Sequence, residues 1–135
     1  MEGVSGTNLM EHIIAQALEV IRRGGLLLYP TDTLWGIGCD ATNEQAVEKI
    51  FALKQRAESK SLIVIADSMA MVERYVQQVP EMAYSLVEIA AQPLTIIYPQ
   101  AAGLAANATA ADGSIAIRVV QHDFCKALLR RFKKP

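Results

Sequence analysis

The sequence predicts one α/β domain over residues 1–135 with a mixed sheet, because candidate helices and short apolar strands alternate along its first half. Hydrophobic residues make up 52% of the chain and charged residues 20%, which is typical of a globular protein that buries a single core. We find no internal repeat and no linker that would divide the chain.

The first predicted element is an amphipathic helix. Residues Asn8–Glu11 resemble a capping box, and Gly24 and Gly25 are typical of a helix C-terminus. Between them, apolar residues recur at helical spacing at Ile13, Ile14, Ala17, Leu18 and Ile21.

A strand and a second helix follow. The apolar run Leu26–Tyr29 predicts a strand that is covered on both faces, and Pro30 ends it because proline has no N–H for a ladder. Thr42 or Asn43 is a candidate cap for the helix that runs to Lys54. Its expected inward side chains are Val47, Ile50, Phe51 and Leu53.

The second half predicts three strands, at Leu62–Ala66, Leu94–Tyr98 and Ser114–Val120. Asp67 and Ser68 resemble a cap for a short helix through Met71, Val72 and Tyr75. Pro80 opens a helix containing Met82, Leu86, Val87 and Ile89, and a basic amphipathic helix spans Asp123–Phe132. The small residues between the last two strands predict a mobile loop.

Composition narrows the function classes. The net charge of -1 argues against strong non-specific nucleic-acid binding by the whole surface, but it leaves room for a local basic site. Cys39 and Cys125 have no metal or redox spacing, and the N-terminus lacks the features of a signal peptide. No apolar run is long enough to span a bilayer. We therefore expect a cytoplasmic protein with reduced thiols and no membrane partner.

The common catalytic fingerprints are missing. The sequence contains no GxxxxGK[ST], GxGxxG or GxSxG pattern, so a phosphate site would have to be built from side chains. Neither His12 nor His122 has an evident triad or metal cluster around it, which disfavours a hydrolase or a zinc enzyme.

Three cations within seven positions, Lys54, Arg56 and Lys60, follow the second helix, and Ser61 adds a hydroxyl where the next strand begins. Arginine offers a planar fork for phosphate or carboxylate, and lysine offers a compact charge. A solvated basic loop is the alternative interpretation.

A polar turn, Thr31-Asp32-Thr33, interrupts the segment YPTDTLWGIGCDA at Tyr29–Ala41. These side chains either form Asx and hydroxyl turns after the strand or face a ligand. Trp35 is more often a core residue than a stacking platform, and Gly36 and Gly38 are explained equally well by positive φ.

Arg118 lies within the predicted strand Ser114–Val120. If its side chain points inward, it needs an anion or another acceptor, because an unpaired buried charge is very costly. An edge position or a solvent-facing orientation would remove that requirement.

Taken together, the segments YPTDTLWGIGCDA, KQR…KSL, QPLTIIYP and SIAIRV resemble the YrdC/Sua5 family in residue type and order. The resemblance covers roughly residues 24–135. It implies a twisted mixed or antiparallel sheet with flanking helices around a basic concave cavity. The characterised members of the family are L-threonylcarbamoyladenylate synthases.

The resemblance also implies a reaction. Threonine and bicarbonate or CO2 give a carbamate, which attacks the α-phosphate of ATP and expels pyrophosphate. Mg²⁺ is expected with ATP, although the sequence shows no dedicated metal cage. The product, threonylcarbamoyl-AMP, serves the t6A modification of tRNA through a partner transferase complex.

The site residues follow from matching positions. Lys54 and Arg56 are the implied catalytic and phosphate-binding residues, with Lys60 and Ser61 bordering the same nucleotide. Thr31 and Thr33 are similar to residues of the threonine pocket, and Arg56 and Arg118 would contact the amino acid. Such a reaction needs no histidine base, because the carbamate oxygen is already a nucleophile.

Two alternatives stay open. One is a family member that binds tRNA, ribosomal RNA or other double-stranded RNA without synthesis. The other is a carbamoyl-transfer module of the hydrogenase-maturation type, which the absence of acylphosphatase or zinc-finger segments disfavours.

The sequence departs from the family pattern in places. The chain has Trp35 where tyrosine is common, and Gln55-Arg56-Ala57 replaces Gly-Arg-Pro. Members usually continue beyond a segment like Phe132–Pro135 into a strand with a Ser-x-Asn motif. We therefore expect a C-terminally shortened domain with an unpaired sheet edge.

Overall fold

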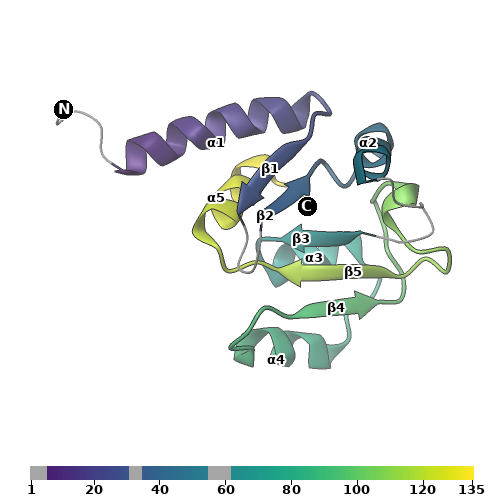
Figure 1. Cartoon of the computed structure of the whole chain (residues 1–135). Coiled ribbons are helices and arrows are strands. Elements are labelled where there is room, and N and C mark those ends of the chain that lie inside the picture. Colours follow the sequence, from purple (N-terminus) through teal and green to yellow (C-terminus); the bar gives the residue numbers. More distant parts are fainter. Residues whose placement is uncertain (1–5, 31–34, 55–61) are drawn as a thin grey trace.

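The computed structural model describes residues 6–30, 35–54 and 62–135, and it has the predicted α/β class (Figure 1). A β-hairpin and a separate three-stranded sheet form the strand framework, with helices packed around them. The hairpin consists of β1 (Leu27–Pro30) and β2 (Trp35–Gly38). The sheet consists of β3 (Ile63–Ala66), β4 (Thr95–Tyr98) and β5 (Ile115–Val119). The α-helices are α1 (Gly6–Arg22), α2 (Glu44–Lys54), α3 (Met69–Tyr75), α4 (Glu81–Ile89) and α5 (Asp123–Phe132).

Helix α1 confirms the predicted helix but begins earlier than the expected cap, so that Asn8 lies inside it. Its C-terminus is built as predicted, because Gly24 adopts a φ of 80° and donates its N–H to the carbonyl of Ile21. The buried residues of α1 are Ile14, Ala17, Leu18 and Ile21, whereas Ile13 is exposed.

Gly36 and Gly38 lie in a strand that the sequence did not predict. Residues Trp35–Gly38 pair antiparallel with β1, and Gly38 stands opposite Leu27. Gly38 does not have positive φ. It is required for close packing, because a Cβ at this position would overlap Cε1 of Tyr29. Leu28 is 63% exposed, so the prediction that β1 is covered on both faces is wrong.

The three-stranded sheet is mixed, as predicted. Strand β5 lies in the middle, parallel to β3 and antiparallel to β4. Ile65 and Thr95 are the register partners of Arg118 on its two sides.

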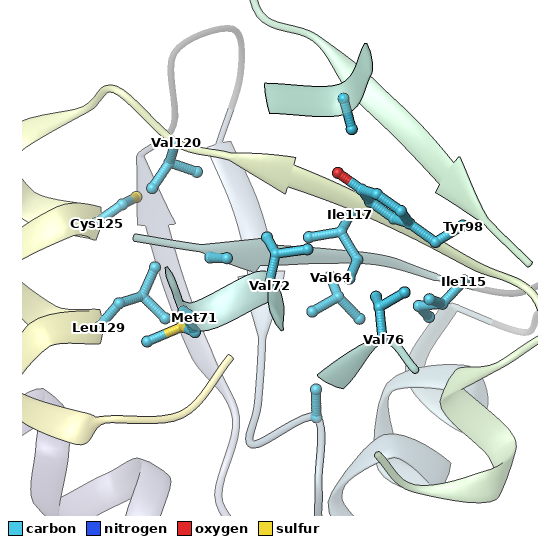
Figure 2. Close-up of a cluster of buried hydrophobic side chains, with 13 residues drawn as sticks. Val64, Met71, Val72, Val76, Tyr98, Ile115, Ile117, Val120, Cys125 and Leu129 are labelled. Atoms are coloured by element: carbon cyan, nitrogen blue, oxygen red, sulfur yellow. The ribbon is translucent and has the colours of Figure 1, made fainter. Parts of the chain in front are cut away.

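The main core lies between one face of this sheet and α3, and Figure 2 shows its side chains converging. Ile115 and Ile117 of β5 and Val64 of β3 contribute from the sheet, while Met71 and Val72 contribute from the helix. Ser68 caps α3 as predicted by accepting the N–H of Met71 through its hydroxyl, at 3.3 Å. This packing fixes which face of β5 is buried.

Several apolar residues of two predicted helices are exposed. Leu53 of α2 was expected to point inward, and that prediction is wrong; Met82, Leu86 and Ile89 of α4 are exposed as well. Helix α4 instead buries Ala83, which is small enough for the helix to pack closely on the core. Helical spacing identifies a face of the helix, but the neighbouring elements decide which face is covered.

The segment between β4 and β5 is packed, in contrast to the loose loop that its composition predicts. Ala105 and Ala108 are buried against Val47 and Phe51 of α2, around a short 3₁₀ turn at Ala106–Ala108. The N–H of Ala105 also bonds the carbonyl of Ala41, at 2.9 Å.

An apolar pocket lies between the hairpin, α1 and α5, and both cysteines line it beside Tyr29. Burial raises the pKa of Cys39 to about 11, with the charge of Asp40 adding to the effect. Burial also raises the pKa of Tyr29 to about 12, with smaller contributions from Cys125 and Cys39. Both groups are therefore neutral at physiological pH.

Gly38→Ala should lower the free energy of unfolding by about 1–3 kcal/mol, because the new methyl group overpacks the Tyr29 ring. Urea unfolding of both single variants and the double variant with Tyr29→Ala measures the coupling. In the Tyr29→Ala background the same change should cost much less. Equal costs in the two backgrounds would show that the ring contact is not the cause.

The free energy of unfolding should fall at alkaline pH, because Cys39 and Tyr29 ionise there. Because folding raises both pKa values, their contribution is complete below the unfolded values of 9.0 and 10.0 and is lost as pH rises through about 11 and about 12. In Cys39→Ala, the free energy of unfolding should fall less steeply between pH 9.0 and about 11, the two pKa values of the thiol. Urea titration at each pH measures it. An unchanged decline would contradict the assignment.

Candidate functional site

Arg118 is the predicted site residue whose side chain the structure describes. It lies on β5, the middle strand of the described sheet, so the edge-strand alternative is wrong. The side chain is half-buried, on the face opposite the one that Ile117 contributes to the core. Its Nε donates a hydrogen bond to Oγ1 of Thr95, at 2.9 Å.

Thr95 was not identified from the sequence. It begins β4 and stands directly opposite Arg118 in the antiparallel register, which brings the two side chains to one face. A pairing across 23 positions depends on which strands are neighbours, so local sequence gives no signal for it. The nearest available signal was a β-branched hydroxyl residue at the start of an apolar run.

Toward the residues that the structure describes, the guanidinium of Arg118 donates from Nε, and its terminal nitrogens bond none of them. Among the described residues, no carboxylate forms an ion pair with Arg118. The ion pair that these residues do form joins Lys134 to Asp40. A half-buried guanidinium that is held at Nε can present its Nη atoms to a planar anion such as a carboxylate. The arrangement is therefore suited to anion binding.

The hairpin reaches the neighbourhood of Arg118 through Tyr29. Tyr29 and Ile65 line the same pocket, and Ile65 is the register partner of Arg118 on β3. Thr31 and Thr33, together with Asp32, fall outside the described residues, so their predicted contacts remain predictions. Tyr29, the residue before the last of β1, therefore lies in one pocket with the β3 neighbour of Arg118.

Lys54 is the last residue of α2, but its side chain lies outside the described part, as do Arg56, Lys60 and Ser61. The start of α2 is fixed by Asn43, whose Oδ1 accepts the N–H groups of Gln45 and Ala46 at 3.0 and 3.1 Å. The next described strand, β3, pairs with β5. The chain therefore leaves α2 at Lys54 and returns beside the strand that carries Arg118.

A cavity of about 210 Å³ lies beside α4 and the segment that follows it, and neither Arg118 nor Thr95 lines it. Leu94, which precedes Thr95, and Val119, which follows Arg118, both line it, and Gln121 supplies a polar group. Because successive strand residues point to opposite faces, Leu94 and Val119 lie on the side away from Arg118 and Thr95, so this cavity is separate from the anion site.

We next considered metal-binding groups and the two histidines in the described part of the chain. No group of three or more His, Cys, Asp or Glu residues there could hold a metal ion. His12 is exposed on α1, and His122 precedes α5 with Nδ1 buried and without a hydrogen-bond partner. The described helices also include none long and apolar enough to cross a membrane.

Comparison with known proteins places these features in a family. The Sua5/YciO/YrdC domain family, described as "Telomere recombination", matches residues 19–135. Relatives named threonylcarbamoyl-AMP synthase include one from Pseudoalteromonas translucida, 35% identical over 90% of this chain and 67% of its own. One from Hydrogenovibrio crunogenus is 33% identical over 90% of this chain and 68% of its own. The chain thus spans about two thirds of the length of these relatives.

Solved structures agree on the fold. The crystal structure of P. abyssi Sua5 in complex with L-threonine has a TM-score of 0.87 at 30% identity, over 93% of this chain and 37% of that protein. The crystal structure of E. coli YciO has a TM-score of 0.81 at 23% identity, over 93% of this chain and 61% of that one. With the sequence match over residues 19–135, these similarities show that the chain belongs to the Sua5/YciO/YrdC family.

Proposed function

We propose that this protein is a threonylcarbamoyl-AMP synthase, which makes its product from L-threonine, bicarbonate or CO2, and ATP. The observation that carries the proposal is Arg118, a half-buried cation whose Nε bonds Thr95 and whose terminal nitrogens bond none of the described residues. Relatives with this activity in their names and a threonine-bound member of similar fold support it.

The chemistry has two steps. The threonine amine adds to the carbon of CO2 and loses a proton, which gives a carbamate. A carbamate oxygen then forms a bond to the α-phosphorus of ATP while the bond from that phosphorus to the bridging oxygen breaks and pyrophosphate leaves. Because two anions must meet, catalysis consists mainly of positioning them and neutralising their charge.

Each proposed residue has a task in this scheme, and Arg56 has two. Arg118 pairs with the threonine carboxylate, assisted by Arg56, and Thr31 and Thr33 line the amino-acid pocket. Lys54 and Arg56 neutralise the triphosphate, and Lys60 and Ser61 border the nucleotide. Mg²⁺ enters with ATP, since the described residues offer no cluster that would hold it independently.

In the cell the product would be consumed by the transferase complex that completes t6A on tRNA, in the cytoplasm. A non-synthesising RNA-binding member of the family is the second candidate, favoured by the three cations Lys54, Arg56 and Lys60 within seven positions. It predicts salt-sensitive RNA affinity that ATP does not abolish.

Pyrophosphate release should require threonine, bicarbonate and ATP together. Lys54→Ala and Arg56→Ala should each lower kcat by about 100-fold or more, because each removes a charge that stabilises the transition state. Lys49→Ala is the matched control on the same helix, since its ammonium bonds the carbonyl of Gly24. No release with all three substrates, or full rates in the Lys54 and Arg56 variants, would overturn the synthase proposal.

Arg118→Ala should raise the KM for threonine by about 10–100-fold, which corresponds to the loss of a charge-assisted hydrogen bond worth about 1.5–3 kcal/mol. Thr95→Val should raise the same KM by about fivefold, because the guanidinium loses its acceptor, and Thr95→Ser should restore it. The KM for ATP is the internal control. Equal increases in both KM values would contradict the assignment of Arg118 to threonine.

A further inference from the structure

Helix α4 exposes its large apolar side chains. Met82, Leu86 and Ile89 are 71%, 41% and 76% exposed. Residues four and seven positions apart lie on one face of a helix, so these three side chains form one stripe, which we call the α4 apolar stripe. The buried residue of α4 is the small Ala83. An exposed apolar stripe next to the core is typical of an interaction site.

The stripe faces away from the rest of the protein. Tyr84 donates its hydroxyl to a carboxylate oxygen of Glu73 on α3, so this side of α4 is turned toward α3. A helix turns by about 100° per residue, which places Tyr84 on the opposite side from Met82 and Ile89. Figure 1 shows α4 beyond β4, at the end of the molecule farthest from α1. The stripe is therefore accessible to another molecule.

The charge around the stripe is negative. Residues 75–117 contain Glu81, Glu88 and Asp112 and no lysine, arginine or histidine. Glu81 and Glu88 belong to α4 itself, are exposed, and form no ion pair with another described residue. Because they are seven positions apart, both lie on one side of the helix, next to the stripe. The stripe thus has an acidic border.

The C-terminus of α4 adds partial negative charge. Ala90 ends the helix in an extended conformation, with φ −65° and ψ 122°, whereas α5 ends in a left-handed cap. Pro93 stands four residues after Ile89 and has no N–H to donate to its carbonyl. Among the described residues, no backbone group outside the helix donates to the carbonyls of residues 86–89. Such a helix end carries roughly half a negative charge and favours a cation.

The cavity of about 210 Å³ lies at this same end of α4. Val87 and Ala90 line it from the helix, and Pro93 and Leu94 line it from the segment that follows. An apolar cavity of about 150 Å³ is enough to hold benzene, so this cavity has room for an aromatic or branched side chain. Pockets that receive one anchoring side chain are typical of the centre of protein interfaces.

Charge decides between the possible occupants. A second copy would bring the glutamates of two α4 helices together, and residues 75–117 supply no cation to neutralise them. The basic helix α5 of a second copy offers no apolar anchor from Cys125 or Leu129, because both are buried. A bilayer is disfavoured because helices that lie on membranes present lysine and arginine to anionic lipids, and α4 has neither.

We propose that the α4 apolar stripe and the adjoining cavity bind an amphipathic helix of another protein, with large apolar side chains on one face and lysine or arginine beside them. One apolar side chain of the partner fills the cavity and others cover the stripe. Its cations meet Glu81, Glu88 and the carbonyls at the end of α4. The proposal does not depend on the synthase activity, since none of these residues belongs to the proposed catalytic site.

Three synthetic helical peptides test the proposal. They share one face of leucines with a single tryptophan, and carry lysine, glutamine or glutamate beside it. Amide NMR shifts of the labelled protein locate the binding site, and fluorescence anisotropy gives the Kd. The lysine peptide should shift residues of α4 and of the cavity lining, and should bind about tenfold or more tightly than the glutamate peptide. This difference should shrink as the salt concentration rises.

Two double variants probe the two components of the surface. Met82→Ser/Ile89→Ser should weaken binding of the lysine peptide by about tenfold or more, because the apolar contacts are lost. Glu81→Gln/Glu88→Gln should weaken it by about threefold to tenfold and remove most of the preference for lysine over glutamate. Both should keep the urea midpoint of the unchanged protein, since all four side chains are exposed.

Leu9→Ser and Glu11→Gln are the matched controls, because they change an exposed apolar and an exposed acidic residue of α1. Both should leave the Kd unchanged. Absence of peptide binding, shifts outside α4 and the cavity, or equal losses in the controls would each overturn the proposal. Self-association in light scattering, or binding to phosphatidylserine vesicles, that Met82→Ser/Ile89→Ser abolishes while no peptide binds would also overturn it, in favour of a second copy or a membrane.

Discussion

The placement of β5 between β3 and β4 is the constraint on which both the core and the candidate site depend. Alternation along this strand sends Ile115 and Ile117 into the core and leaves Arg118 on the opposite face. Burial of the two isoleucines against α3 fixes the register by the hydrophobic effect, because a one-residue slip would bring the arginine into the core. The position of the cation is thus a consequence of packing on the other side of the sheet.

The turn at Asp40–Thr42 joins several segments that surround this sheet. Asp40 is buried at 7% exposure, and its Oδ1 accepts both the N–H and the hydroxyl of Thr42, at 2.8 and 2.6 Å. The adjacent Ala41 donates to the carbonyl of Pro135 and accepts from Ala105. One short turn therefore connects the hairpin, α2, the segment before β5 and the residues after α5. Satisfying these backbone groups is what lets a segment of small residues pack without a large core of its own.

Arg118 differs in physical character from the cations at the ends of α1 and α5. It is single, half-buried and oriented by a neutral acceptor, which suits recognition of one small anion. Arg22, Arg130 and Arg131 are exposed and lie in the last turns of their helices, where the helix dipole favours a cation.

The sequence by itself determined the α/β class, the family and most element positions, including α5 at its observed bounds and the helix stop at Gly24. These rest on local chemistry: helical spacing, caps and the conformational freedom of glycine. Local sequence also singled out Arg118 as a candidate, because a charge within an apolar strand requires explanation wherever the strand lies.

Only the tertiary structure decided which apolar faces are covered, since Leu28, Leu53 and Ile89 are exposed although their patterns match those of buried residues. It also decided that Gly38 serves close packing with Tyr29 and that Thr95 accepts from Arg118. These are contacts between residues distant in sequence, whose energies depend on strand order and register. Local pattern contains no information about either, so they emerge only when the chain packs.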